Sequence, residues 1–265
     1  MTKATISLLL AGFVLAGPGV AMSQVIAPDS STPASAIQSD PARGSSSFAN
    51  PSLGATFTSV GGDLRHMFAR DNAGVLTMFG TAALFATRWD RVAVGEAREL
   101  PSGLVSAGNP TGALVTQLGG AFATFAIGKV THSSRVTTLG SHLIRAQVSS
   151  QIVVQTLKFA AERSRPDSTD HFSFPSGHTA SAFATATVLQ RDFGWKVGIP
   201  AYAVGAWVAA SRMGSNKHYL SDVLAGAAIG MSAGRAVTIG SNRMKFDVGV
   251  APATGGAAVM FTKRN

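Results

Sequence analysis

The sequence predicts an all-α protein, a helical bundle that ends in a short β-hairpin. Apolar segments with helical spacing follow one another after Gly61 and Gly62, and no strand-like alternation separates them. Near the C-terminus the spacing changes, because alternating segments flank a turn-forming stretch. The expected helices cover residues 71–87, 111–130, 137–161, 180–191, 199–213 and 221–239.

The third of these segments is amphipathic. Its apolar residues fall close to one helical face, whereas Arg145 and Gln155 lie off that face. An apolar stripe of this kind packs against neighbouring helices, which favours a bundle. The hairpin is expected within residues 241–265, because 245–250 and 258–262 flank the turn-forming sequence Ala253-Thr254-Gly255-Gly256.

The first 23 residues have the three parts of a secretory signal peptide. Lys3 precedes an apolar run over 6–16, and small residues up to Ser23 fit a cleavage site. The alternative, a membrane anchor, needs a longer run than this one, which Pro18 and its flanking glycines break. Residues 24–60 are rich in Ser, Pro, Ala and Gly and are expected to form a flexible linker. One helical catalytic domain is expected over 61–240.

Composition excludes several classes of site. The 265 residues include no cysteine, so neither a disulfide nor a thiolate metal site is available. The formal charge of +9 is spread without dense basic runs, so we expect no nucleic-acid partner, although a positive field favours anionic substrates and anionic membrane surfaces. Apolar stretches of about 12 to 19 residues are at or below the length of a membrane span. We therefore expect an exported, periplasmic domain, soluble or membrane-associated.

Three separated segments carry candidate chemistry, and the first places two cations near a helix end. Lys158 and Arg165 are separated by six residues, and Pro166 turns the chain away from the helix, so both side chains can face one point. Taken alone, such residues are more often solvated charges that interact favourably with the helix dipole.

The second segment, Pro175-Ser176-Gly177-His178, begins a helix of small residues. Ser176 is a predicted N-cap, and the backbone amide of Gly177 then lies at the positive end of the helix, where an anion is favoured. The alternative is an ordinary capped helix with an incidental histidine at position 178.

The third segment contains Arg212, His218 and Asp222. His218 and Asp222 are four residues apart, so on one helical turn the carboxylate can accept a hydrogen bond from the imidazole and leave its other nitrogen free. An isolated pair with this spacing commonly does no more than stabilise a helix.

Together the segments read Lys-x6-Arg-Pro, Pro-Ser-Gly-His and Ser-Arg-x5-His-x3-Asp, in that order. This pattern resembles the signature of the type 2 phosphatidic acid phosphatase (PAP2) superfamily, which also contains bacterial class A acid phosphatases and vanadium haloperoxidases. Every signature position is matched, and the resemblance covers residues 158–222. It implies a bundle of the PAP2 and haloperoxidase type.

The resemblance implies a phosphatase that acts on phosphomonoesters or on lipid phosphates and diphosphates without a metal. His218 would be the nucleophile and form a phosphohistidine, Asp222 would orient it, and His178 would be the general acid and then the general base. The phosphate would be bound by Lys158, Arg165, Ser176, Gly177 and Arg212.

The resemblance implies no cofactor, and vanadate is expected as an inhibitor or phosphate mimic. Two alternatives remain open. In a vanadium haloperoxidase the same site would hold vanadate, although the family's haloperoxidases are generally larger chains. A non-catalytic envelope scaffold would use the bundle and hairpin for binding. The sequence leaves the oligomeric state and the identity of the phosphorylated small-molecule or lipid substrate undetermined.

Overall fold

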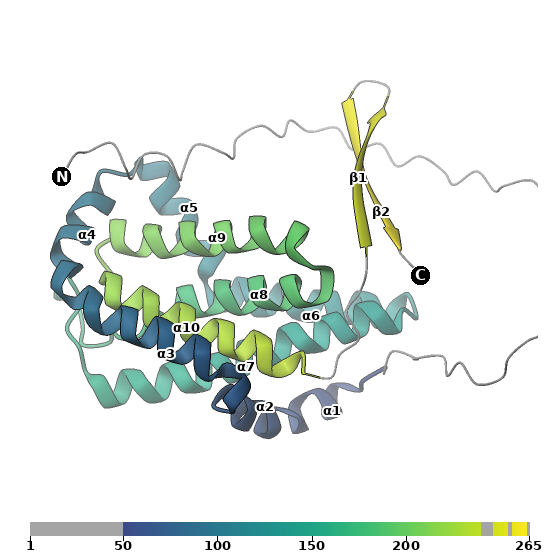
Figure 1. The fold of residues 1–265 in the computed structure, drawn as a ribbon, viewed down its shortest axis with the longest axis horizontal. Coiled ribbons are helices and arrows are strands. Elements are labelled where there is room, and N and C mark those ends of the chain that lie inside the picture. The colour runs from purple at the N-terminus through teal and green to yellow at the C-terminus, as the bar shows by residue number, and fades with distance from the viewer. Residues whose placement is uncertain (1–49, 240–245, 254–255, 264–265) are drawn as a thin grey trace, which may run out of the picture. The chain divides into compact units, whose positions relative to one another are not determined.

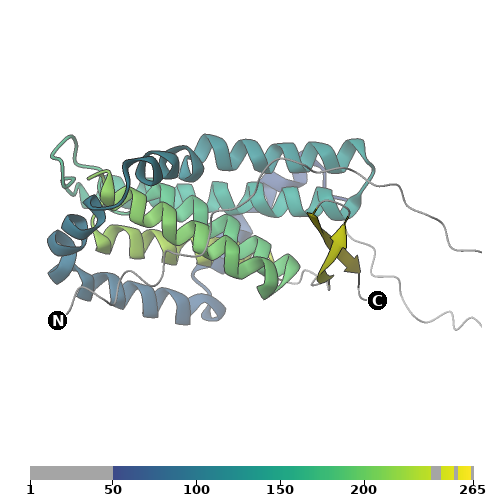
Figure 2. The same cartoon turned by 90° about the horizontal axis from the view of Figure 1, so that it is seen from above.

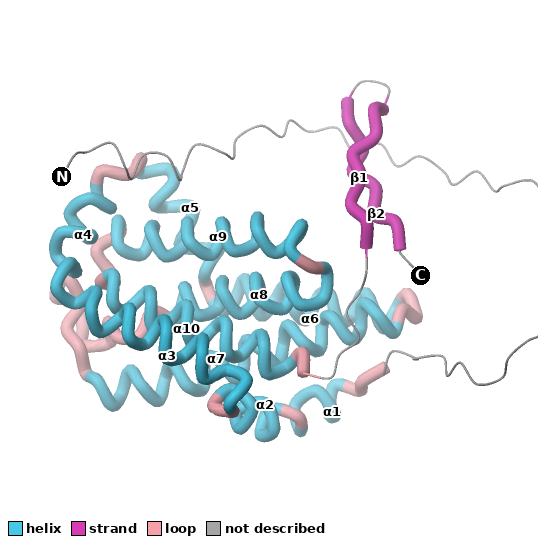
Figure 3. The backbone as a smooth tube through the Cα atoms, viewed as in Figure 1, coloured by secondary structure: helices cyan, strands magenta, loops and turns pink. Residues whose placement is uncertain are grey.

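The computed structural model describes residues 50–239, 246–253 and 256–263, and these residues form a helical bundle and an antiparallel hairpin (Figures 1 and 3). The helices are α1 (Leu53–Thr58), α2 (Val60–Met67), α3 (Arg70–Ala86), the 3-10 turn η2 (Thr87–Trp89), α4 (Asp90–Arg98), α5 (Ser102–Gly112), α6 (Leu114–Val130), α7 (Ser134–Ala161), α8 (Gly177–Phe193), α9 (Trp195–Gly214) and α10 (Leu220–Val237). The strands are β1 (Phe246–Ala253) and β2 (Gly256–Lys263), paired from Phe246 opposite Lys263 to Ala253 opposite Gly256. The predicted all-α bundle is confirmed.

The N-terminal half contains more helix than the sequence predicts. Four helices, α1, α2, α4 and α5, lie outside the predicted ranges. The predicted linker is wrong over 53–60, where α1 begins after the N-cap Ser52 and its buried Thr56 hydrogen bonds to Ser141 of α7 at 2.9 Å. The predicted signal peptide and the linker as far as residue 49 lie outside the described residues.

Helix α10 packs against α8, α3, α7 and α2 (Figure 1), and Figure 2 shows the same bundle turned by 90°. It contributes to two apolar clusters. Val237 packs with α6, α7 and α8 residues that include Phe125, Ile144 and Val188. Ile229 belongs to a second cluster, which includes Met67 of α2. One helix thus connects most of the core.

Helices α8 and α10 run parallel, with their backbones in contact. A Cβ added at Gly226 would lie 2.5 Å from the carbonyl oxygen of Ser176, and a Cβ added at Gly230 would lie 2.2 Å from that of Ala180. No larger residue fits so close an approach without a shift. Because both helices begin at the same end of this contact, the Ser176 amide donates to the Asp222 carbonyl oxygen at 3.0 Å.

Two arginines of the long apolar helices bind the N-terminal helices. Arg145 of α7 forms a bidentate pair with the buried Asp63 of α2, in which its Nε lies 2.7 Å from Oδ2. Arg235 of α10 donates from Nε to Asn72 Oδ1 of α3 at 2.9 Å.

Within the described residues, no single helix has both the length and the apolarity needed to cross a bilayer, and α5 and α6 reach that threshold only as a pair bent by 52°.

Replacement of Gly230 tests the backbone contact between α8 and α10. We expect Gly230→Ala to lower the free energy of unfolding by about 1–3 kcal/mol, because the added methyl group overpacks the interface. Gly80→Ala in α3 is the matched control, since a Cβ there meets nothing within 4 Å. The control should be neutral or more stable by up to about 1 kcal/mol. Urea unfolding measures both, and a Gly230→Ala variant as stable as Gly80→Ala would contradict the contact.

Candidate active site

The three motif segments meet at one end of the bundle, where α7 and α9 end and α8 and α10 begin (Figure 3). Backbone hydrogen bonds join the segments. The Ser173 amide donates to the Arg163 carbonyl oxygen at 2.9 Å, and the His218 amide donates to the Arg212 carbonyl oxygen at 3.3 Å. The side chains that the sequence predicts as a site therefore come from the ends of α7 and α9, the beginnings of α8 and α10 and the loops between them.

His218 is buried, and one ring nitrogen is engaged by a backbone carbonyl. Nδ1 lies 2.6 Å from the Ser173 carbonyl oxygen, whereas the nearest oxygen of Asp222 is 3.8 Å away. The predicted hydrogen bond from the imidazole to the Asp222 carboxylate is therefore wrong, because 3.8 Å is too long for one. A carbonyl oxygen can only accept, so Nδ1 carries the proton and the lone pair is on Nε2.

Asp222 acts on His218 through Ser173. Its Oδ2 accepts from the Ser173 hydroxyl at 2.5 Å and from the Tyr219 amide at 2.8 Å, and its Oδ1 accepts from Arg163 at 2.6 Å. Burial alone would raise the pKa of Asp222, but the neighbouring imidazole, these donors and the Arg163 charge lower it below its ordinary value. The carboxylate thus fixes Ser173, whose carbonyl fixes the imidazole.

Arg163 and Asp90 complete this network, and sequence reasoning missed both. Arg163 donates to Asp90 at 2.7 Å as well as to Asp222, and its guanidinium lies 4.3 Å from the ring centre of Tyr219. Asp90, at the start of α4, also accepts from the Ser221 amide and hydroxyl, each at 2.8 Å. The position of Arg163 inside the first motif segment is a weak sequence signal of its role. Asp90 is distant from the motifs, and no sequence pattern marks it.

Three cations lie around the imidazoles, as the sequence predicts. Burial and then the charge of Arg165 lower the pKa of Arg212 to about 10 and that of Lys158 to about 8. Arg212 donates to Asn109 Oδ1 at 2.7 Å, and its buried Nε has no protein partner. Lys158 donates to the Phe172 carbonyl oxygen at 2.5 Å, and Arg165 donates to Asp170 at 2.6 Å. A bound anion would relieve the repulsion within this cluster.

His178 lies in the first turn of α8, next to the cations. Burial is the largest cause that lowers its pKa to about 4, followed by the charges of Arg212, His218, Arg165 and Lys158. Burial also lowers the pKa of His218, and the Asp222 carboxylate opposes that shift. Both imidazoles are therefore neutral at pH 7 when no anion is bound.

Ser176 is the N-cap of α8, as predicted. Its hydroxyl accepts from the Thr179 amide at 3.4 Å and from the Thr179 hydroxyl at 3.0 Å, and its own amide donates to Asp222. Gly177 is the first residue of the helix, where backbone amides point out of the helix end. Direct contact of Ser176 and Gly177 with phosphate stays a prediction.

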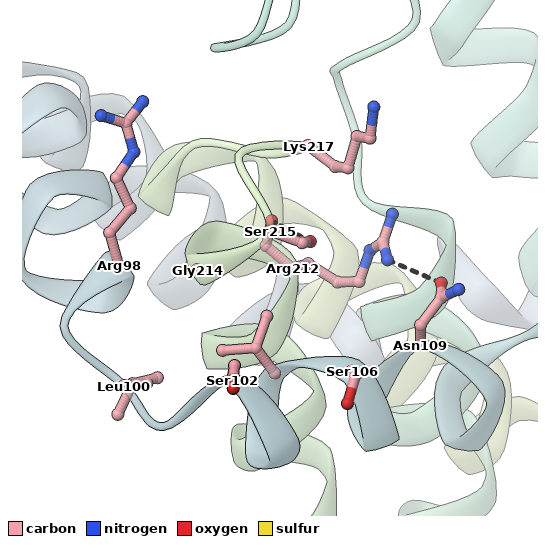
Figure 4. Close-up of a pocket in the computed structure, with 10 residues that line it drawn as sticks. Arg98, Leu100, Ser102, Ser106, Asn109, Arg212, Gly214, Ser215 and Lys217 are labelled. Carbon is pink, nitrogen blue, oxygen red and sulfur yellow. Dashed lines mark hydrogen bonds between the residues drawn. The ribbon is translucent and has the colours of Figure 1, made fainter.

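A cavity of about 520 Å³ adjoins Arg212, and we call it the side pocket (Figure 4). It lies where α4, α5 and the end of α9 meet. Figure 4 shows the Arg212 guanidinium reaching Asn109 of α5, whereas Arg98 comes from α4. Its polar lining residues include Arg98, Ser102, Ser106, Asn109, Arg212 and Lys217.

Comparisons with known proteins agree with this site. The sequence model of the PAP2 superfamily matches residues 140–245. A segment of 85 residues is 41% identical to the Lipid A 1-phosphatase of Porphyromonas gingivalis and covers 31% of this chain and 19% of that protein. The chain thus spans about a fifth of the length of the curated relative it matches.

The fold can also be compared with a solved structure, the first transmembrane PAP2 type phosphatidylglycerolphosphate phosphatase from Bacillus subtilis. The two have a TM-score of 0.49 and 20% sequence identity, over 63% of this chain and 94% of that one. The family match and the curated relative are independent of this likeness. The PAP2 superfamily model matches residues 140–245, and every predicted site residue lies inside this range.

Proposed function

We propose that the protein is a lipid phosphatase in which His218 is the nucleophile. The observation that carries the proposal is the state of this imidazole. Its Nδ1 is held by the Ser173 carbonyl oxygen at 2.6 Å, and burial keeps the ring neutral, so Nε2 offers a lone pair beside three cations. A neutral imidazole with an oriented partner on its far nitrogen is an activated nucleophile.

In the proposed reaction, His218 Nε2 attacks the phosphorus atom and the bond from phosphorus to the leaving oxygen breaks. The leaving oxygen takes a proton from His178, and a phosphohistidine remains. Neutral His178 then accepts a proton from water as that water attacks the phosphohistidine, which releases inorganic phosphate and restores both histidines. His178 must be protonated for the first step, and the negative charge of a bound phosphate raises its pKa for this purpose.

Lys158, Arg165 and Arg212 supply the charge that the reaction needs. Phosphoryl transfer spreads negative charge over the three phosphate oxygens, and preorganised donors stabilise it without reorganisation. We propose that these cations serve in place of a metal ion.

A lipid substrate is supported by the surface beside Lys158 as well as by the relative's activity on lipid A. Phe159 is 68% exposed and packs edge-on against Phe172 with ring centres 5.5 Å apart. Phe172 also provides the carbonyl oxygen that Lys158 contacts. Exposed apolar side chains at the edge of a polar site are typical of contact with lipid.

Replacement of His218 tests the proposed function. We expect purified wild-type protein in EDTA to release phosphate from phosphatidic acid, undecaprenyl pyrophosphate or p-nitrophenyl phosphate, and His218→Ala to reduce release by at least about a thousandfold. His171→Ala is the matched control, because His171 is an exposed loop histidine that contacts Ser164. No release by the wild type, or equal loss in both variants, would overturn the proposal. Halide oxidation that requires vanadate would favour a haloperoxidase.

Replacement of His178 tests its role as the general acid. In the wild type, kcat/KM should fall as pH rises above the pKa of about 4 in the empty site, because the protonated fraction of His178 falls. His178→Gln should lose this dependence and lose about 10²–10⁴ in kcat with an alkyl phosphate. The loss should be much smaller with p-nitrophenyl phosphate, whose phenolate leaves without a proton. Equal losses with both esters would contradict the role.

The lowered pKa of Lys158 predicts a second pH effect. Inhibition by inorganic phosphate should weaken as pH rises through about 8, because Lys158 then loses its charge. Lys158→Arg keeps its charge across this range and should remove that step. Inhibition constants should be measured from pH 6.5 to 9.5 for both proteins, because the titration of phosphate itself affects both equally and the titration of Lys158 affects only the wild type. Superimposable pH profiles would contradict the assignment of this step to Lys158.

A further inference from the structure

We infer that the side pocket binds a second anionic group of the substrate, so that the enzyme favours substrates with a negative charge beyond the phosphate that is released. The inference rests on the proposed function and adds a substrate class to it. Lys158, Arg165 and Arg212, the three cations proposed to bind the phosphate, are called the phosphate cluster here. Arg212 belongs both to this cluster and to the pocket lining. A substrate whose phosphate lies at Arg212 therefore has the pocket open beside it.

The charge of the pocket supports an anionic ligand. None of its lining side chains is acidic, and three are cationic, namely Arg98, Arg212 and Lys217. Lys217 is paired with Asp167 at 2.5 Å, which neutralises much of its charge. Arg98 and Arg212 contact only amide oxygens, those of Asn216 at 2.6 Å and Asn109 at 2.7 Å. Within the described part of the chain, neither guanidinium has a carboxylate partner.

The chemistry of the lining favours a polar group. Ser102, Ser106 and Asn109 of α5 and Ser215 after α9 supply hydroxyl and amide groups, and the buried Nε of Arg212 is an unused donor. A cavity of about 520 Å³ is within the range of small-molecule sites. A phosphorylated or carboxylated head group suits this lining better than an acyl chain.

The test compares the affinities of stable phosphonates by calorimetry, so that turnover is not required. Methylphosphonate can occupy only the phosphate cluster. Methylene- and propylene-bisphosphonate carry a second phosphonate group, separated from the first by a shorter and a longer linker. We expect at least one bisphosphonate to bind about tenfold more tightly than methylphosphonate. Arg98→Gln should abolish this preference and leave methylphosphonate affinity unchanged, and Arg98→Lys should keep most of it.

Arg91→Gln is the matched control, because Arg91 is also exposed on α4 but does not line the pocket. No preference for either bisphosphonate in the wild type, or the same loss in Arg91→Gln as in Arg98→Gln, would overturn the inference. Phosphate release without the preference for a bisphosphonate would overturn the proposed second anion site but not the proposed phosphatase activity. The preference without phosphate release on any ester would overturn the phosphatase and leave an anion site.

Discussion

The backbone contact between α8 and α10 is the constraint on which the site depends. Glycines on α10 let it lie against the carbonyl groups of α8, and the two helices run in the same direction. Their N-terminal ends therefore meet, and each brings one imidazole, since His178 lies in the first turn of α8 and His218 just precedes α10. A side chain between the helices would separate the two imidazoles, which act together in the proposed reaction.

Near this pair, a carboxylate that accepts several hydrogen bonds lies close to an arginine with an unused donor. Asp222 is surrounded by donors and stays ionised, while Arg212 is buried without a carboxylate partner among the residues that the structure describes. Burying a charge without a partner costs stability. We attribute that cost to the proposed function, because the unused Nε donor of Arg212 stays available to a phosphate.

The sequence predicts which motif residues gather at the site better than how they are connected. Lys158, His178 and His218 each lie at or next to the end of a predicted helix, and the three motif segments meet in the structure. Asp90 is different, because its contact with Ser221 joins residues 131 positions apart and no local pattern marks it. Helix α5 was missed because its glycines, Asn109 and Pro110 are typical of loops. Its packing against α9 joins residues far apart in the sequence, which no local pattern predicts.

The glycine contact also limits how the molecule can change. Since α8 and α10 touch along their backbones, the side of the site that holds the two imidazoles has no room for larger residues at the contact. On the opposite side, the side pocket is lined by residues of α4, α5 and the end of α9. Under the proposed function, reaction and selectivity therefore depend on different residues. The pocket residues Arg98, Ser102 and Ser106 can diverge in sequence, and with them the choice of ligand, while Asp90 and the residues around the two imidazoles stay the same.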